Sequence, residues 1–262
     1  SGRVAEGDMG WRLNVLGERL NGEAPGTEGK RGLLALAMDA RLSRDSLLEG
    51  EFELSRRAQR SVPGLSLLGP NLPPADPKLN INHQPWSQPV DFRNFSGSLR
   101  FTQAINSEWN WQAQVGTQRL VTDDYLAYPY GCWAENTYQR FCSNGDFALY
   151  DSPSLDERRN THAAQWRVNG QFATGEVQHK LSAGILASRF TQRGQTRSNY
   201  SGYILGGNLN TLPAVPANPQ FVDTFTQRTE RSTELFATNV IEWSPALQTW
   251  VGLRHTRLNR RS

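Results

Sequence analysis

Leu48–Ser55, with the sequence LEGEFELS, decides the fold. Every second residue is apolar or glycine, and the residues between them are three glutamates and a serine. Successive side chains of a β-strand point to opposite faces of the sheet, so this alternation predicts a strand with one apolar and one polar face. Three carboxylates on one face can lie neither in a packed core nor in lipid, so the polar face must be wet or paired.

Two further runs show the same alternation. Trp109–Val115 (WNWQAQV) and Ala164–Phe172 (AQWRVNGQF) each set apolar residues against asparagine, glutamine or arginine. A tilted strand needs about 9–11 residues to cross a bilayer, and these runs fit strands of that length. The pattern therefore favours strands that have lipid on one face and water on the other.

The composition excludes several other classes of protein. The 262 residues are 37% hydrophobic with a mean hydropathy of −0.61, and no apolar run is long enough for a membrane helix. The net charge of +3 comes from 28 basic and 25 acidic residues, a balance that does not indicate nucleic-acid binding. The eight tryptophans suit interfacial aromatic girdles better than a compact core.

Reading the alternation along the chain predicts about nine strands. They are Trp11–Leu20, Leu33–Leu42, Leu47–Arg57, Phe92–Gln103, Glu108–Arg119, His162–Phe172, Val177–Gln192, Thr229–Trp243 and Leu247–Arg260. The first and last strands have no closing partner, and bacterial single-chain barrels have even strand counts. We therefore expect an all-β, antiparallel segment of a larger, 22-stranded transmembrane barrel, with residues 1–262 as the N-terminal part of the barrel domain.

The connections between these strands alternate in length. Short turns are predicted at Ser43–Ser46, Ala104–Ser107, Ala173–Glu176 and Ser244–Ala246. Between them come a medium loop at Asn21–Gly32 and long loops at Ala58–Asp91, Leu120–Thr161 and Arg193–Arg228. Outer-membrane barrels have tight periplasmic turns and extended external loops, so the asymmetry predicts which end faces the periplasm.

Several side chains can be placed on this scheme. Trp109, Trp111, Trp243 and Trp250 lie close to short turns and predict a periplasmic-side aromatic belt, although some could point into the lumen instead. The polar positions Glu49, Glu51, Glu53, Arg167, Lys180 and Arg254 are expected to face the lumen.

Cys132 and Cys142 are close in sequence within a long loop, which favours a disulfide over two free thiols and hence an oxidising compartment.

One hairpin carries a family resemblance. Gln171–Gly184 reads QFATGEVQHKLSAG and resembles a strand–turn–strand of TonB-dependent siderophore receptors. The residues that match are Phe172, Thr174, Gly175, His179, Leu181 and Gly184. Two other stretches agree with the same family: Trp11–Arg19 (WRLNVLGER) and Glu234–Arg254, which ends in a strand containing Trp250, Gly252 and Arg254.

The resemblance implies an outer-membrane receptor of a Gram-negative bacterium that takes up ferric siderophores with energy delivered through TonB. It implies a plug domain and a TonB-contacting segment that are not recognisable in this sequence, and outer-membrane lipid or lipopolysaccharide as surroundings. Iron would arrive as cargo inside its chelate, so no cofactor is expected to be bound directly. The protein would not be an enzyme, and nucleic acid would not be a partner.

Ligand contact is expected in the long loops. Siderophores are often flat, partly aromatic or anionic, which favours aromatic and basic side chains. The candidates are Trp86, Tyr125, Tyr128, Tyr130, Trp133, Tyr138, Arg140, Phe141, Tyr200 and Tyr203. The alternative for each is that it packs the loops together or lies at the outer lipid interface. The four histidines are scattered, and no metal site is expected.

Other functions remain open at this point. A passive outer-membrane porin or substrate-specific channel would share the strand rhythm, and a related receptor could carry cobalamin or a sugar. A barrel-embedded hydrolase would need a nucleophile beside a histidine base, and the sequence has no suggestive spacing of that kind. A soluble all-β binding protein would not depend on detergent.

Overall fold

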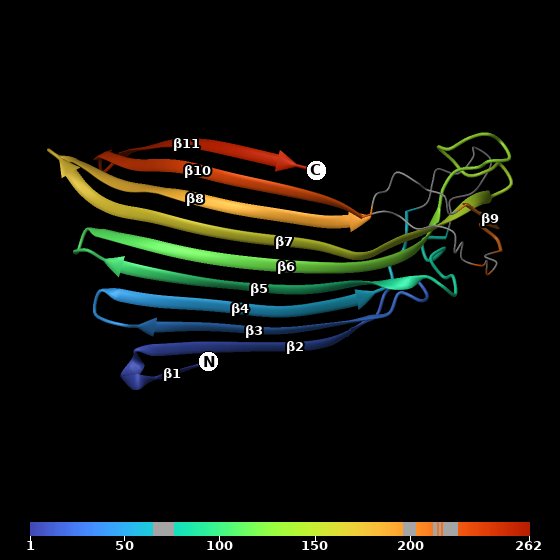
Figure 1. The fold of residues 1–262 in the computed structure, drawn as a ribbon, viewed down its shortest axis with the longest axis horizontal. Helices are drawn as coiled ribbons and strands as arrows, with labels where there is room; N and C mark the ends of the chain where they lie inside the picture. The colour runs from blue at the N-terminus through green and yellow to red at the C-terminus, as the bar shows by residue number, and fades with distance from the viewer. Residues whose placement is uncertain (65–75, 196–202, 212–213, 215, 217–224) are drawn as a thin grey trace.

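The computed structural model describes residues 1–64, 76–195, 203–211, 214, 216 and 225–262. Within these residues, eleven strands form one antiparallel sheet in which almost every strand pairs with its neighbours in sequence (Figure 1). The strands are β1 (Gly2–Val4), β2 (Met9–Leu20), β3 (Gly29–Arg41), β4 (Ser46–Gln59), β5 (Gln88–Ala104), β6 (Trp109–Pro129), β7 (Asp146–Thr174), β8 (Val177–Gln195), β9 (Tyr203–Asn208), β10 (Phe225–Ser244) and β11 (Leu247–Arg261). A short 3-10 helix, Ala5–Gly7, joins β1 to β2.

The predicted fold class is confirmed. The nine predicted strands are β2 to β8, β10 and β11, and they pair in the order β2-β3-β4-β5-β6-β7-β8-β10-β11. β1 and β9 are additional; β9 lies beside the first residues of β7 and leaves the main strand order unbroken. No helix in the described part of the chain has the length and apolar character needed to cross a membrane.

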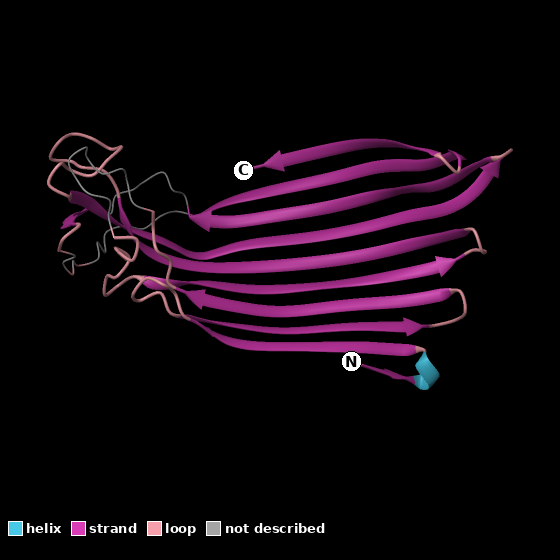
Figure 2. Ribbon diagram, turned by 180° about the vertical axis from the view of Figure 1, so that it is seen from behind, coloured by secondary structure: helices cyan, strands magenta, loops and turns pink. Residues whose placement is uncertain are grey.

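The predicted asymmetry of the two ends is also seen. The turns after β3, β5, β7 and β10 lie together at one end, called here the short-turn end, while the long connections gather at the other, the loop end (Figures 1 and 2). Gly175, in the turn between β7 and β8, has a φ of +64°. That angle suits glycine and explains the Thr-Gly pair of the motif.

The predicted loops are too long, because the strands extend into them. Residues 120–129 continue β6 and residues 146–161 belong to β7, so the connection between these strands is 130–145 rather than Leu120–Thr161. Similarly, β5 already begins at Gln88. The backbone pairing continues past a bulge at Thr122 and Asp124. Beyond the band of alternating residues both faces are polar or covered by loops, so the pairing continues without a period-two signal.

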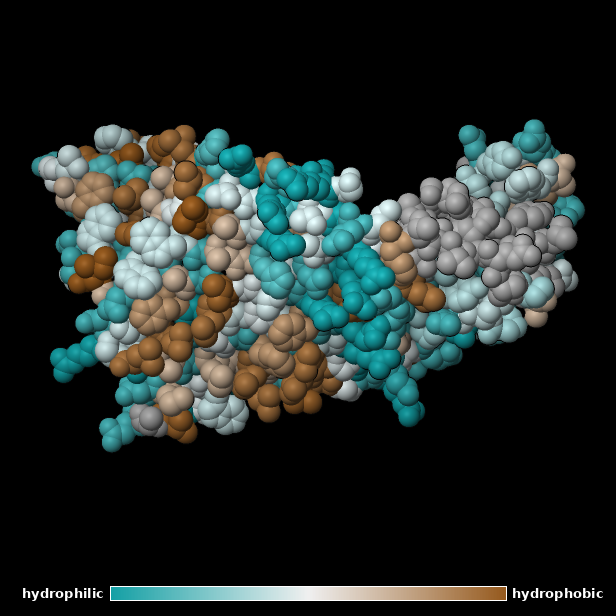
Figure 3. Space-filling model, in the orientation of Figure 1, coloured by the Kyte–Doolittle hydropathy of each residue, from teal (hydrophilic) through white to brown (hydrophobic). Residues whose placement is uncertain are grey.

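The register divides the sheet into an apolar and a polar face. Leu54 lies opposite Leu34 and Phe95, and Val115 lies opposite Leu99 and Ala164. These residues belong to a continuous apolar face that also contains a T-shaped pair of Phe52 and Phe95, with ring centroids 5.5 Å apart. No second layer covers this face within the described residues. Figure 3 shows hydrophobic side chains spread over the strands and a hydrophilic zone between them and the loop end.

The opposite, polar face carries the predicted lumen charges. Glu49 accepts two hydrogen bonds from Arg100, at 2.7 and 2.8 Å, and Lys180 contacts Glu242 at 2.6 Å. Arg254 lies 3.5 Å from Glu234. Glu49, Lys180 and Arg254 are therefore paired across strands.

The aromatic belt is only partly as predicted. Trp111 lies on the apolar face, where its ring packs at a tilt against Phe101 with centroids 5.3 Å apart, and the Trp243 indole donates to Thr249 of the same face at 2.8 Å. Trp109 is also on that face. Trp250 lies opposite Val240, whose partner on the other side is Lys180, and it belongs to the polar face. Successive side chains of a strand point to opposite faces, so Trp250 and its neighbour Thr249 lie on different faces of the sheet.

Candidate functional site

The loop end is built around a disulfide. Cys132 and Cys142 are bonded, with Cα atoms 4.9 Å apart, and both are buried. The hairpin between them is closed by reciprocal backbone hydrogen bonds of Cys132 and Thr137, at 2.7 and 2.9 Å. Gly131 precedes it with a φ of +67°, and a Cβ there would come within 3.0 Å of the Tyr138 backbone. The segment therefore forms a compact lobe.

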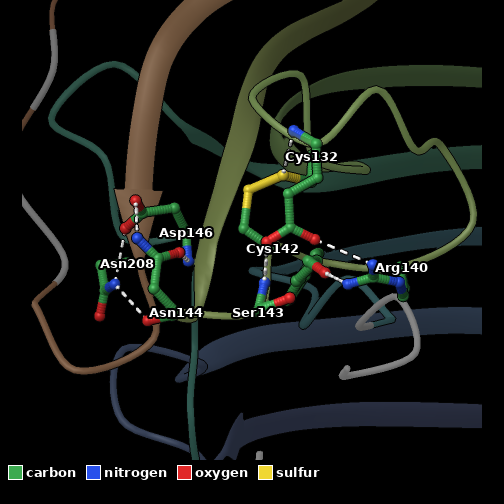
Figure 4. The surroundings of a disulfide bond; sticks show 9 residues. Cys132, Arg140, Cys142, Ser143, Asn144, Asp146 and Asn208 are labelled. Atoms are coloured by element: carbon green, nitrogen blue, oxygen red, sulfur yellow. Dashed lines mark hydrogen bonds and ion pairs between the residues drawn. A yellow bond between two sulfur atoms is a disulfide. The ribbon is translucent and has the colours of Figure 1, made fainter. Parts of the chain in front are cut away.

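Polar contacts complete the lobe (Figure 4). The Ser143 backbone N–H donates to Glu135 at 2.6 Å, and Arg140 pairs with Glu135 at 2.9 Å. The Ser143 hydrogen bond and the nearby Arg140 charge lower the pKa of the Glu135 carboxyl. Asn208, at the end of β9, donates to Asp146 at 2.6 Å, so a segment distant in sequence is fastened to the start of β7.

A small apolar core lies beneath the disulfide. Its buried residues are Ile81, Ala127, Phe141, Phe147 and Leu149. The Phe141 and Phe147 rings have centroids 5.0 Å apart. Phe141 has 0% of its surface exposed. The prediction that Phe141 contacts ligand is therefore wrong: it is a core residue, because it points to the inside of the lobe from the disulfide segment.

Asn82 fastens the segment before β5 onto this core. The side chain is fully buried; its Oδ1 accepts from the Ala127 N–H at 2.9 Å, and its Nδ2 donates to the Ser61 carbonyl at 3.0 Å. A buried amide satisfied from two directions fixes both partners in place. No sequence pattern pointed to Asn82, because its partners are distant along the chain.

Four of the predicted ligand residues form one exposed aromatic surface. They are Tyr128, Tyr130, Trp133 and Tyr138. Trp133 is 53% exposed and Tyr138 48%, and their rings meet edge-to-face at 6.1 Å. Tyr128 stacks on Tyr130 at 6.2 Å.

Tyr150 connects the two pairs of the aromatic surface. Its ring meets Tyr130 at 6.4 Å, and its hydroxyl accepts from the Trp133 indole at 3.1 Å. Tyr150 was not among the predicted ligand residues; it lies on β7, where the register sets it opposite Tyr128. The aromatic surface therefore rests on a strand as well as on the disulfide.

The other predicted ligand residues that are described make contacts within the protein. Trp86 and Tyr125 pack together at 5.0 Å, and the Tyr125 hydroxyl donates to Asp151 at 3.1 Å. Burial, reinforced by the Asp151 charge, raises the pKa of Tyr125 to about 12. Arg140 is half-buried and engaged with Glu135 and the Phe141 carbonyl. Tyr200 lies outside the described residues; Tyr203 belongs to β9, and its side chain is not described.

Among the described residues, one set of potential metal ligands lies at this end, and it cannot bind a metal through its sulfurs. Cys132, Glu135 and Cys142 are close enough together to consider, but the two sulfurs are bonded to each other and cannot act as thiolate ligands. Residues of the Gln171–Gly184 hairpin make packing contacts. Phe172 stacks on His179 at 4.7 Å beside a short turn, and a Cβ at Gly184 would approach the Trp166 carbonyl to 2.4 Å.

No family model matches this chain, and a search of curated proteins finds no relative. Among solved structures, it is similar to the ferric-catecholate import receptor of Escherichia coli K12, with a TM-score of 0.80 at 15% identity over 98% of this chain and 41% of that one. The ferric preacinetobactin receptor of Acinetobacter baumannii gives 0.77 at 15% identity, covering 98% and 38%.

The ferripyoverdine receptor of the Pseudomonas aeruginosa outer membrane gives a TM-score of 0.80 at 12% identity, covering 98% of this chain and 34% of that one. The chain thus spans about two fifths or less of these structures. At these identities the likeness shows the fold: this chain has the architecture of a barrel segment of siderophore receptors. All of these neighbours are receptors, and none is an enzyme.

Proposed function

We propose that this chain supplies the wall and ligand-facing loops of an outer-membrane receptor that takes up ferric siderophores with energy delivered through TonB. One observation carries the proposal. The two-faced sheet, with short turns at one end and a packed lobe at the other, matches siderophore receptors over 98% of its length. In such a barrel, the apolar face contacts lipid, the polar face lines the lumen and the loop end faces outside.

Residues 1–262 would then be the N-terminal part of the barrel domain of a longer protein. A barrel satisfies every backbone group only when its sheet closes, and the edges of β1 and β11 have no strand partner among the described residues. Further strands, a plug and the TonB-contacting segment would come from other parts of that protein. Iron would be carried within its chelate and would need no protein ligand.

The aromatic surface is the part of this chain that we expect to meet the chelate. Tyr128, Tyr130, Trp133 and Tyr138 offer flat, partly exposed rings held by a disulfide and by β7. Rings that are ordered before binding lose little conformational entropy when a ligand stacks on them. Their faces attract aromatic chelates and, through the ring quadrupole, cationic groups.

Uptake by the full-length protein tests this function. The complete gene would be expressed in an iron-starved host lacking its own siderophore receptors, and uptake of radioactive iron from a panel of ferric siderophores would be measured with and without TonB. We expect TonB-dependent uptake of at least one chelate. Trp133→Ala with Tyr138→Ala should lower it severalfold, whereas the control Trp166→Ala with Phe95→Ala, on the apolar face of the strands, should affect it less.

Two results would contradict the proposal. Uptake that persists without TonB would indicate a passive channel. Failure of every iron chelate to compete or support growth would remove the siderophore as ligand, and cobalamin and sugars would then be the ligands to test. Barrel assembly, followed by heat-modifiable mobility on gels, must be equal in all variants for the comparison to hold.

A further inference from the structure

Four arginines meet on the apolar face near the loop end. Arg189 of β8, Arg231 of β10, and Arg257 and Arg261 of β11 line one hollow of about 470 Å³. Its other lining residues are Thr229, Thr233 and Asn259. The register places all seven on the same face: Arg231 is opposite Arg189 and Asn259, and Thr229 is opposite Arg261.

This arrangement leaves positive charge without a counterion. Arg189 and Arg231 are direct cross-strand neighbours, and like charges in that position destabilise a sheet. No carboxylate among the described residues forms an ion pair with any of the four arginines. The acidic residues of β10, such as Glu230 and Glu234, face the other side, where they pair with Arg260 and Arg254. An anion on the apolar face would remove the repulsion.

An apolar trough opens directly beside the arginines. A hollow of about 770 Å³ is lined mainly by small or apolar residues such as Val115, Ala164 and Ala187, and it shares Arg189, Arg231 and Thr233 with the arginine hollow. On β8 the apolar run of the face, which includes Ile185 and Ala187, ends at Arg189. The face therefore changes from apolar at Ala187 to cationic at Arg189, the next residue of β8 on that face. An amphipathic ligand needs such a neighbouring pair of apolar and charged surfaces.

We propose that the four arginines bind the phosphate groups of an anionic outer-leaflet lipid, with lipopolysaccharide as the occupant and an acyl chain lying in the trough. The proposal depends on the proposed function only in placing the apolar face in the outer membrane. Guanidinium groups suit phosphate because their fixed fork of N–H donors forms paired, charge-assisted hydrogen bonds. Arginine costs little at the membrane interface but several times more at the midplane, which agrees with the position of the cluster at the loop end.

A free phosphate ion would satisfy the charges but not the trough. The two hollows share three residues, so a ligand that fills both must join an anionic head to an apolar tail. Basic sites at the membrane surface recognise lipid head groups by this combination of charge and insertion. The shape thus favours a lipid over a soluble anion.

Lipid binding by the full-length receptor in detergent tests the proposal. Bis-phosphorylated lipid A would be titrated by native mass spectrometry against wild type, Arg189→Gln/Arg231→Gln and the charge-matched control Arg12→Gln/Arg254→Gln on the polar face. We expect the first variant to bind lipid A at least about tenfold more weakly, because it loses charge-assisted hydrogen bonds. The control should bind like wild type, and Arg189→Lys/Arg231→Lys should recover part of the affinity.

Two further ligands show whether the phosphate comes from a lipid or from free phosphate ion. Dephosphorylated lipid A should bind wild type weakly, and inorganic phosphate at millimolar concentration should not displace lipid A. Equal affinity of wild type and the glutamine variant, or full displacement by inorganic phosphate, would overturn the proposal. If the double variant fails to assemble, Arg257→Gln alone gives the same comparison. Lipid A binding without iron-chelate uptake would leave this site intact while rejecting the transport function.

Discussion

Opening the disulfide should loosen the loop lobe without disturbing the sheet. The change is reduction of the full-length protein, or the double variant Cys132→Ser/Cys142→Ser. The two cysteines are separated by 10 residues. In the chain-entropy treatment, a cross-link closing a loop of about that length stabilises the closed lobe by about 2.7 kcal/mol at 25 °C. Since each ~1.4 kcal/mol is a factor of ten, local opening should become about a hundredfold more frequent.

Hydrogen exchange measured by mass spectrometry resolves this effect by segment. Peptides covering 127–149 should exchange faster by about two orders of magnitude after reduction, because the lobe can open as a local unit. Peptides from β3, β4 and β5 serve as internal controls and should not change, because backbone pairing rather than the disulfide holds them. Two results would refute the reasoning: unchanged exchange in 127–149, or an equal rise in the strands.

Three other predictions address separate parts of the molecule. Leu36→Arg, on the apolar face, should cost about 2–4 kcal/mol of folding free energy in lipid vesicles, while Ala37→Arg on the polar face should cost much less; equal losses would contradict the assignment of faces. The raised pKa of Tyr125, about 12, means that the folded state keeps the phenol proton as the pH rises from 10 to 12, so the stability of the folded state declines across that window. In a titration of absorbance at 295 nm, Tyr125 should not contribute below pH 11, so the wild type and Tyr125→Phe should titrate alike in that range. Gly184→Val should reduce barrel assembly, because its Cβ would lie 2.4 Å from the Trp166 carbonyl; normal heat-modifiable mobility would show that the sheet absorbs the contact.

Some of the candidate site could be anticipated, and some could not. Trp133 and Tyr138 were expected in an external loop rich in aromatic residues, and both are exposed there. Phe141 belongs to the same stretch of sequence and is fully buried. Residue type cannot separate them, because direction within an irregular loop depends on the disulfide and on Phe147, which packs from another strand.

The alternation around Leu48–Ser55 was sufficient by itself to determine a two-faced antiparallel sheet, since a period of two leaves a strand no other way to separate apolar from polar side chains. Turn length then distinguished the two ends. Only the tertiary structure decided how strands line up, because register depends on partners distant in sequence. That register put Trp250 on the polar face, extended β6 and β7 beyond the alternating band, and brought Arg189 and Arg231 side by side.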